Sequence, residues 1–98
     1  MYGTVARMRP KAGQEQALVN IMKEFERDRK PKVKGFVASY VYKSEKSPGD
    51  LIMAVVFQDH DSYHANADDP EQDRWYRRFR ELLEADPVWE DGEIISAS

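Results

Sequence analysis

The order of hydrophobic and polar positions divides the chain into alternating β-type and α-type segments. The stretch 2–9 is rich in β-formers, contains no acidic residue and stops before Pro10, which predicts a first strand. Apolar side chains then recur at the helical spacing i, i+3, i+4, i+7 over about 13–29, and the segment ends near Pro31. These positions are Leu18, Ile21, Met22 and Phe25. The spacing predicts an amphipathic helix whose apolar stripe faces a core.

Two β-type segments follow the predicted helix. The segment 36–43 opens after Gly35, and the segment 51–57 follows the turn-forming stretch 44–50. The pair is therefore predicted to be an antiparallel hairpin. Strict alternation places Phe36, Ala38, Tyr40 and Tyr42 on one face of its first strand and Val37 and Val41 on the other. The second strand is apolar on both faces, which is typical of a strand that is covered on both sides.

The second half of the chain is predicted to be helical and then to end in a strand. Polar N-cap candidates at 59–62 precede a short helical turn at 63–66, and Pro70 fits the first turn of a longer helix that stops before Pro87. The longer helix carries an apolar stripe of Trp75, Phe79, Leu82 and Leu83. A last strand is expected at 93–97, after an Asp91-Gly92 turn.

This order, β-α-β-β-α-β, predicts one α+β domain spanning 1–98 with the ferredoxin-like arrangement, a four-stranded antiparallel sheet with two helices on one face. Two helices cover one face of the sheet only. The other face would carry alternate residues of the strand 51–57, and both alternating sets are apolar: Leu51, Met53, Val55 and Phe57, or Ile52, Ala54 and Val56. An exposed apolar face of this size usually marks an interface. We therefore expect a homodimer through sheet-to-sheet packing, a dimeric α/β barrel.

Composition narrows the classes of function. The net charge of −3 argues against nucleic-acid binding, because a surface that follows phosphates usually needs an excess of Lys and Arg. No apolar run approaches the length of a membrane span, and no export signal opens the chain, so a cytoplasmic location without membrane contact is expected. The chain has no Cys, which excludes thiolate catalysis and cysteine-bound metals.

The residues that could carry chemistry are few. His60 and His64 are the only imidazoles, and their i, i+4 spacing lacks an evident third metal ligand, so a polar loop without metal is expected. Asp68-Asp69 could act in acid–base catalysis, but N-terminal capping of the following helix explains the pair better. The five isolated glycines disfavour nucleotide cofactors.

An aromatic and polar group is the most informative candidate for a site. Its members on the second helical segment are Tyr63, His64, Asn66, Trp75 and Tyr76, and Tyr40 and Tyr42 lie on a strand. Trp75 needs a partner for its indole N–H if it is buried, which fits a mixed apolar and polar cavity. Ordinary core packing is the alternative interpretation of Trp75.

The order of elements and the stretch 57–72 resemble the antibiotic biosynthesis monooxygenase family of dimeric α/β barrels. The likeness spans nearly the whole chain. Tyr63 and Pro70 match the family pattern, whereas Asn66 stands in place of a first His, Asp69 in place of a Ser, and Gln72 where a second His is expected. The resemblance implies a homodimer with one small-molecule pocket per subunit, between the sheet and its helices.

Some members of this family oxidise quinols or aromatic polyketide intermediates with O₂ and without metal or flavin. By this resemblance, His64 becomes the candidate catalytic base, and Asn66 and Tyr76 become hydrogen-bond donors to the developing oxyanion. Tyr63, Trp75 and Phe79 would form the aromatic wall of a pocket for a small hydrophobic or aromatic substrate. No cofactor is implied.

Other functions stay open on the same pocket. Haem-degrading relatives use an Asn, a Trp and a His where this chain holds Gly3 or Thr4, Asn66 and Tyr76, which disfavours haem degradation. A non-catalytic dimer that binds a small molecule, as a sensor or accessory module, is one alternative. An isomerase or cyclase that uses the same base without consuming oxygen is another.

Overall fold

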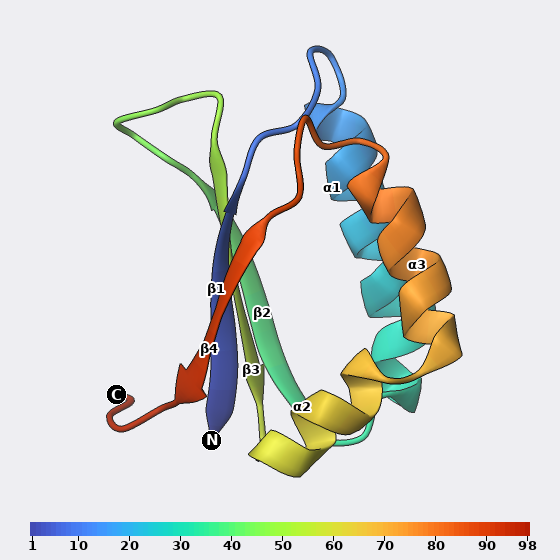
Figure 1. The fold of residues 1–98 in the computed structure, drawn as a ribbon, viewed down its shortest axis with the longest axis vertical. Coiled ribbons are helices and arrows are strands. Elements are labelled where there is room, and N and C mark those ends of the chain that lie inside the picture. The colour runs from blue at the N-terminus through green and yellow to red at the C-terminus, as the bar shows by residue number, and fades with distance from the viewer.

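The protein is one antiparallel sheet with helices packed on a single face, in a computed structural model that describes all 98 residues (Figure 1). The regular elements are β1 (Tyr2–Met8), α1 (Glu15–Glu24), β2 (Phe36–Lys43), β3 (Leu51–Phe57), α2 (His60–Ala67), α3 (Pro70–Arg80) and β4 (Val88–Glu93). A π-helical turn, η1 (Phe25–Arg29), and a 3₁₀ turn, η2 (Lys30–Lys32), continue α1. The predicted ferredoxin-like arrangement is confirmed, and the turn expected at 63–66 is a full third helix, α2. None of the helices has the length and apolar character needed to cross a membrane.

The strand pairing decides which residues face the helices. The sheet order is β2-β3-β1-β4, and all neighbours are antiparallel. Thr4 pairs with Val55 and Ala6 with Met53, and Ala6 belongs to the buried core. The helix-facing side of β3 therefore consists of Leu51, Met53, Val55 and Phe57. Ile52, Ala54 and Val56 lie on the open face, which resolves the choice that the sequence left between the two sets.

The last strand is displaced from its predicted position at 93–97. β4 covers Val88–Glu93, and it pairs with β1 from Arg7↔Val88 to Tyr2↔Glu93. The prediction was wrong because Asp91-Gly92 lies inside the strand instead of forming a turn before it. β1 begins at Tyr2, so residues beyond Ile94 have no strand to pair with, and the bond from Ile94 N–H to Met1 C=O is the last one. An edge strand tolerates such polar residues.

A register shift between Phe36 and Ala38 changes the predicted faces of β2. Phe36 pairs with Phe57, and after the shift Ala38 pairs with Val56. The shift is a β-bulge, which lets two residues oppose one and reverses the alternation. Phe36 is therefore on the helix side, whereas Ala38, Tyr40 and Tyr42 are on the open face. The prediction that the four share one face was wrong for Phe36.

Local signals fix where α2 and α3 begin. The Asp59 carboxylate accepts a hydrogen bond from Ser62 N–H at 2.7 Å, and Asp69 accepts one from Glu71 N–H at 2.9 Å. Both are N-cap contacts. The capping interpretation is thus confirmed for Asp69, whereas Asp68 terminates α2. Pro70 occupies the first turn of α3, as predicted.

Two apolar surfaces of the sheet have different environments. Between the sheet and the helices, the buried core consists of Ala6, Met8, Leu18, Leu51, Trp75, Phe79 and Leu83. The opposite face carries exposed hydrophobic side chains, among them Val5, Tyr40, Tyr42 and Val88. In Figure 1 no helix lies against this face.

Candidate functional site

A cavity of about 290 Å³ lies between the sheet and the helices. Eight aromatic side chains line it, and they come from η1, from strands β2, β3 and β4, and from helices α2 and α3: Phe25, Phe36, Phe57, Tyr63, Trp75, Tyr76, Phe79 and Trp89. Five polar side chains share the wall: Thr4, Ser39, Asn66, Gln72 and Asp73. The cavity is at the lower end of the size range of ligand pockets, about 300–1,000 Å³, and its mostly apolar wall with a few polar groups is typical of them.

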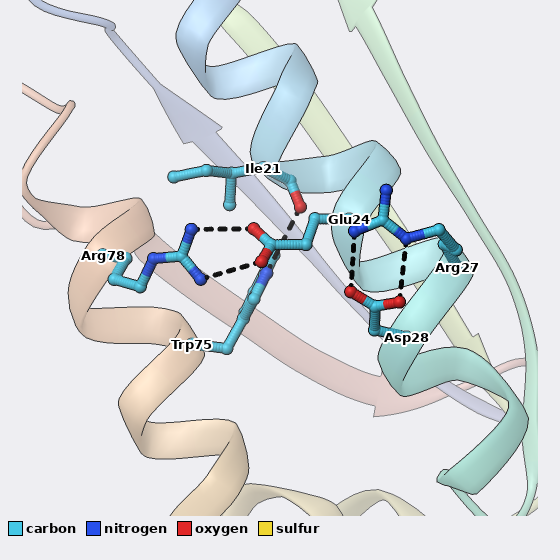
Figure 2. A network of polar contacts seen from close by, with 6 residues as sticks. All are labelled: Ile21, Glu24, Arg27, Asp28, Trp75 and Arg78. Atoms are coloured by element: carbon cyan, nitrogen blue, oxygen red, sulfur yellow. Dashed lines mark hydrogen bonds and ion pairs between the residues drawn. The ribbon is translucent and has the colours of Figure 1, made fainter.

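The predicted aromatic wall is present on α3. Trp75 stacks on Phe79 with ring centroids 5.3 Å apart, and Tyr76 stacks on Phe79 at 5.9 Å. The indole N–H of Trp75 points toward α1 and donates to the backbone carbonyl of Ile21 at 3.3 Å (Figure 2). Trp75 therefore lines the cavity with its ring surface, and its indole N–H already has a hydrogen-bond partner outside the cavity wall.

Helices α1 and α3 are joined on their outer side by an ion pair. The Arg78 guanidinium donates to both Glu24 carboxylate oxygens at 3.1 and 2.8 Å (Figure 2). The hydrogen bond to Arg78 lowers the pKa of Glu24, and the same bond raises the pKa of Arg78. Arg27 and Asp28 form a second, largely exposed pair nearby. Such exposed pairs contribute little stability, although the two-pronged Arg78 contact is the geometry in which an Arg–carboxylate pair is strongest.

Tyr63 links α2 to the edge of the sheet. Its hydroxyl donates to the Asp91 carboxylate on β4 at 2.9 Å. Burial and this hydrogen bond raise the pKa of Tyr63 to about 12, while the nearby Thr4 hydroxyl acts in the opposite direction. Tyr63 is thus a neutral phenol at physiological pH. The buried Thr4 Oγ1 has no hydrogen-bond partner, so it is available to a ligand in the cavity.

The two amide side chains of the cavity share one partner, Arg29. Its Nη2 donates to Asn66 Oδ1 at 3.3 Å and to Gln72 Oε1 at 3.4 Å. Its Nη1 donates to Glu71 Oε2 at 2.9 Å, and the Asp69 carboxylate lies 3.7 Å from Nη2. The Arg29 side chain is only 12% exposed, which is rare for Arg unless it is paired.

Arg29 was not among the residues predicted for the site. It lies at the end of η1, which also brings Phe25 to the cavity. π-helical turns inside α-helices are often found at functional sites. A signal was present in the sequence, because Arg29 follows Phe25 by four residues and so continues the apolar stripe with a cation.

The structure brings five of the six predicted site residues to the cavity and leaves out the sixth. Tyr63, Asn66, Trp75, Tyr76 and Phe79 line the cavity. His64 is exposed, and its ring lies against His60 with centroids 4.2 Å apart and against Tyr2 at 6.1 Å. The imidazole predicted to be the base is therefore on the outer face of α2. No group of three His, Asp or Glu side chains gathers as a metal site.

The arrangement can bind a flat apolar ring and its polar substituents. The aromatic walls would contact the ring faces, and the amides and the Thr4 hydroxyl would donate to oxygen atoms on its rim. The Tyr63 oxygen, whose proton is donated to Asp91, could accept from a ligand hydroxyl. The cavity has one carboxylate, Asp73, whose charge is paired with Arg77 at 2.9 Å.

Comparison with solved structures shows the same fold in proteins from other organisms. A protein from Chloroflexus aurantiacus J-10-fl, provisionally named an antibiotic biosynthesis monooxygenase, is 22% identical with a TM-score of 0.77, and the alignment covers 99% of this chain and 95% of that one. A conserved protein from Methanosarcina mazei Go1 is 19% identical with a TM-score of 0.80, covering 93% and 89%. Rv0793 from Mycobacterium tuberculosis is 14% identical with a TM-score of 0.79, covering 99% and 97%.

Sequence comparison defines the family. No curated protein matches the chain. The model of the antibiotic biosynthesis monooxygenase family matches residues 1–78, from β1 through most of α3, and so includes the helices that carry Tyr63, Asn66 and Trp75. The chain belongs to the antibiotic biosynthesis monooxygenase family.

Proposed function

We propose that the protein is a cofactor-independent monooxygenase that oxidises a quinol-like or small aromatic polyketide-like molecule with O₂. The observation that carries the proposal is the cavity, in which aromatic rings enclose a space with two amides and two phenols on its wall. Membership of a monooxygenase family supports the same reaction class. The volume of about 290 Å³ suits a small aromatic molecule.

An anthrone illustrates the atom balance of such a reaction. Its methylene group loses both hydrogens and becomes a carbonyl, so one oxygen atom of O₂ enters the product and the other leaves as water. The substrate must first lose a proton to give an electron-rich oxyanion that reacts with O₂. The protein would bind the ring between Trp75 and the sheet, hydrogen-bond the oxyanion through Asn66, and keep bulk water from the reactive intermediate.

Tyr63 and Tyr76 complete the proposed polar wall. The pKa of about 12 keeps the Tyr63 phenol protonated and donating to Asp91, so Tyr63 is not a base at neutral pH and its oxygen can only accept a hydrogen bond from a ligand. Tyr76 lines the cavity from α3 and retains its predicted role as a donor to the oxyanion. The proposed reaction therefore depends on stabilising charge on the substrate.

A non-catalytic, ligand-binding function is the second candidate, and the position of His64 favours it. No imidazole lines the cavity, and its one carboxylate is paired with Arg77. A protein that only binds an aromatic metabolite would need the same walls without a proton acceptor. Saturable binding without turnover would support this alternative, and turnover without oxygen consumption would support the isomerase or cyclase alternative.

Oxygen uptake with an anthrone and a naphthoquinol, corrected for their spontaneous oxidation, tests the proposal. Asn66→Ala should lower the rate at least about tenfold, because it removes a donor to the oxyanion. Asn20→Ala, which changes the same residue type at an exposed position on α1, is the matched control. His64→Ala decides the role of the imidazole, since an unchanged rate removes it from the mechanism. A wild-type rate equal to the spontaneous rate with every such compound would refute the oxygenase.

We also propose that the functional unit is a homodimer formed through the open face of the sheet. On this face Val5 is 49% exposed and Tyr40 is 64% exposed, and Ala54 lies between them on β3. Leaving such a surface in water costs free energy that sheet-to-sheet packing would recover.

A further inference from the structure

We propose that Arg29 is a positioning residue that fixes the side-chain amides of Asn66 and Gln72, so that the cavity binds a hydroxyaromatic molecule as its phenolate. This inference deepens the proposed function and rests on the same cavity. It adds the residue that orients the donors and the ionisation state of the ligand.

The hydrogen bonds of Arg29 determine which end of each amide is free. A guanidinium has only donors, so it can bond only to the oxygen atom of an amide. Arg29 Nη2 holds both Asn66 Oδ1 and Gln72 Oε1, within 3.4 Å. The NH₂ group of each amide is therefore the end left free, and both residues line the cavity. The pair presents N–H donors to a ligand oxygen.

Paired N–H donors discriminate between the two forms of a phenol. A phenolate oxygen accepts hydrogen bonds from both amides, whereas the hydroxyl of a neutral phenol is a weaker acceptor. Donors that favour the charged form of a group lower its pKa. The cavity would thus promote loss of the substrate's proton without the imidazole that it lacks.

The charge of Arg29 is not the main source of this preference. Glu71 and Asp69 both lie against the guanidinium, at 2.9 and 3.7 Å, and together they offset its positive charge. The other carboxylates near the cavity are Asp73, paired with Arg77, and Asp91, which accepts from Tyr63. Arg29 therefore acts by holding the amides in place, because its planar guanidinium contacts two carboxylates and two amides at once. A Lys ammonium has the same charge without that fork.

The test measures the pKa of bound 2-naphthol by absorbance titration in the wild-type protein and in two Arg-to-Lys variants. The wild-type protein should lower the pKa of the naphthol by at least about one unit, a tenfold change in the ionisation constant. Arg29→Lys should lose most of this shift. Arg78→Lys is the matched control, since Arg78 also spans two oxygen atoms between helices but contacts neither amide, and it should keep the shift.

This readout separates positioning from general support of the structure. A variant that merely loosens the cavity weakens binding of both forms of the naphthol equally and leaves its pKa unchanged. If Arg29→Lys does not fold, Gln72→Met carries the test, because it removes one donor and leaves the contacts of Arg29 to Asn66 and Glu71.

Three results would overturn the inference: no saturable binding of 2-naphthol, an unshifted pKa in the wild-type protein, or a full shift in the Arg29→Lys variant. Its failure is distinguishable from failure of the oxygenase. A shifted pKa without oxygen uptake would leave the role of Arg29 standing and refute the oxygenase, and oxygen uptake without a shift would do the reverse.

Discussion

The position of α2, which carries Tyr63 and Asn66, depends on close packing between Gly35 and Ser62. Gly35 precedes β2 with φ at +81°, and a Cβ atom added there would lie 2.5 Å from the Ser62 Cβ. The Gly35 carbonyl also accepts a hydrogen bond from Gln58 N–H at 2.7 Å, so the backbone has little freedom to move. Gly35→Ala should therefore strain the backbone and displace the first turn of α2.

Gly13 supplies a control that separates these two costs. It has a similar φ of +77°, but a Cβ there would meet nothing within 4 Å. Gly13→Ala should cost about 1–2 kcal/mol of unfolding free energy from the left-handed backbone alone. Gly35→Ala should add an overpacking cost of about 1–3 kcal/mol, for a total of about 2–5 kcal/mol.

Urea unfolding at one fixed protein concentration, followed by the fluorescence of the two tryptophans, measures each free energy. The double variant Gly35→Ala/Ser62→Gly should recover the overpacking cost, because it removes the Cβ that the new methyl group meets. Ser62→Gly keeps the N–H that Asp59 caps, and its own helix-propensity cost cancels in the double-mutant cycle. Equal losses for Gly35→Ala and Gly13→Ala, or a coupling energy near zero, would refute the packing argument.

Three further variants test other parts of the structure. Val5→Glu, in the middle of the open sheet face, should convert the proposed dimer to a monomer in native mass spectrometry. The control Lys23→Glu, at an exposed position on α1, should leave the dimer intact. A wild-type protein that is monomeric at micromolar concentration would contradict the proposed interface. The fold raises the pKa of Tyr63 from 10 to about 12, so its stabilising effect is complete below pH 10 and is lost as the pH rises toward 12. Relative to Tyr63→Phe, the wild type should lose about 1 kcal/mol over that window in urea unfolding, after allowance for partial solvent access, and parallel profiles would contradict this assignment. Trp75→Phe should cost at least about 1 kcal/mol of unfolding free energy through the lost bond to Ile21, and it should weaken 2-naphthol binding because it removes part of the aromatic wall; an unchanged Kd would contradict that role.

The periodic parts of the fold were predictable because burial follows geometry that repeats along the chain. Trp75 and Phe79 lie four residues apart on a helix, and they are 9% and 1% exposed, as their shared stripe predicts. The strand pair around the 44–50 turn was predictable for the same reason, since alternation and turn residues are local signals. Which face of β3 meets the helices was not, because it depends on pairing with β1.

The errors arose where a non-local partner overrides a local signal. The bulge after Phe36 reverses the alternation of β2, and the Phe36 ring then packs against Phe57. No residue in the segment 36–43 is a sequence signal for a bulge. Asp91-Gly92 has the composition of a turn, yet it extends along β1 as an edge strand. Arg29 has the composition of a solvated helix end, and its burial depends on Asn66 and Gln72, which are distant in sequence.

In the candidate site, the geometry of α2 decides which of the residues assigned a chemical role by their type can reach the cavity. On a helix, residues three and four apart share a face, and residues two apart do not. Tyr63, Asn66 and Ala67 accordingly line the cavity together, while His64 shares the opposite face with His60. Once α2 is a helix, His64 and Asn66 cannot both contact one bound substrate. The cavity is lined by the amide and not by the imidazole, so the proposed oxidation would have to begin with a substrate whose own proton is acidic enough to leave when its oxygen accepts hydrogen bonds from paired N–H donors.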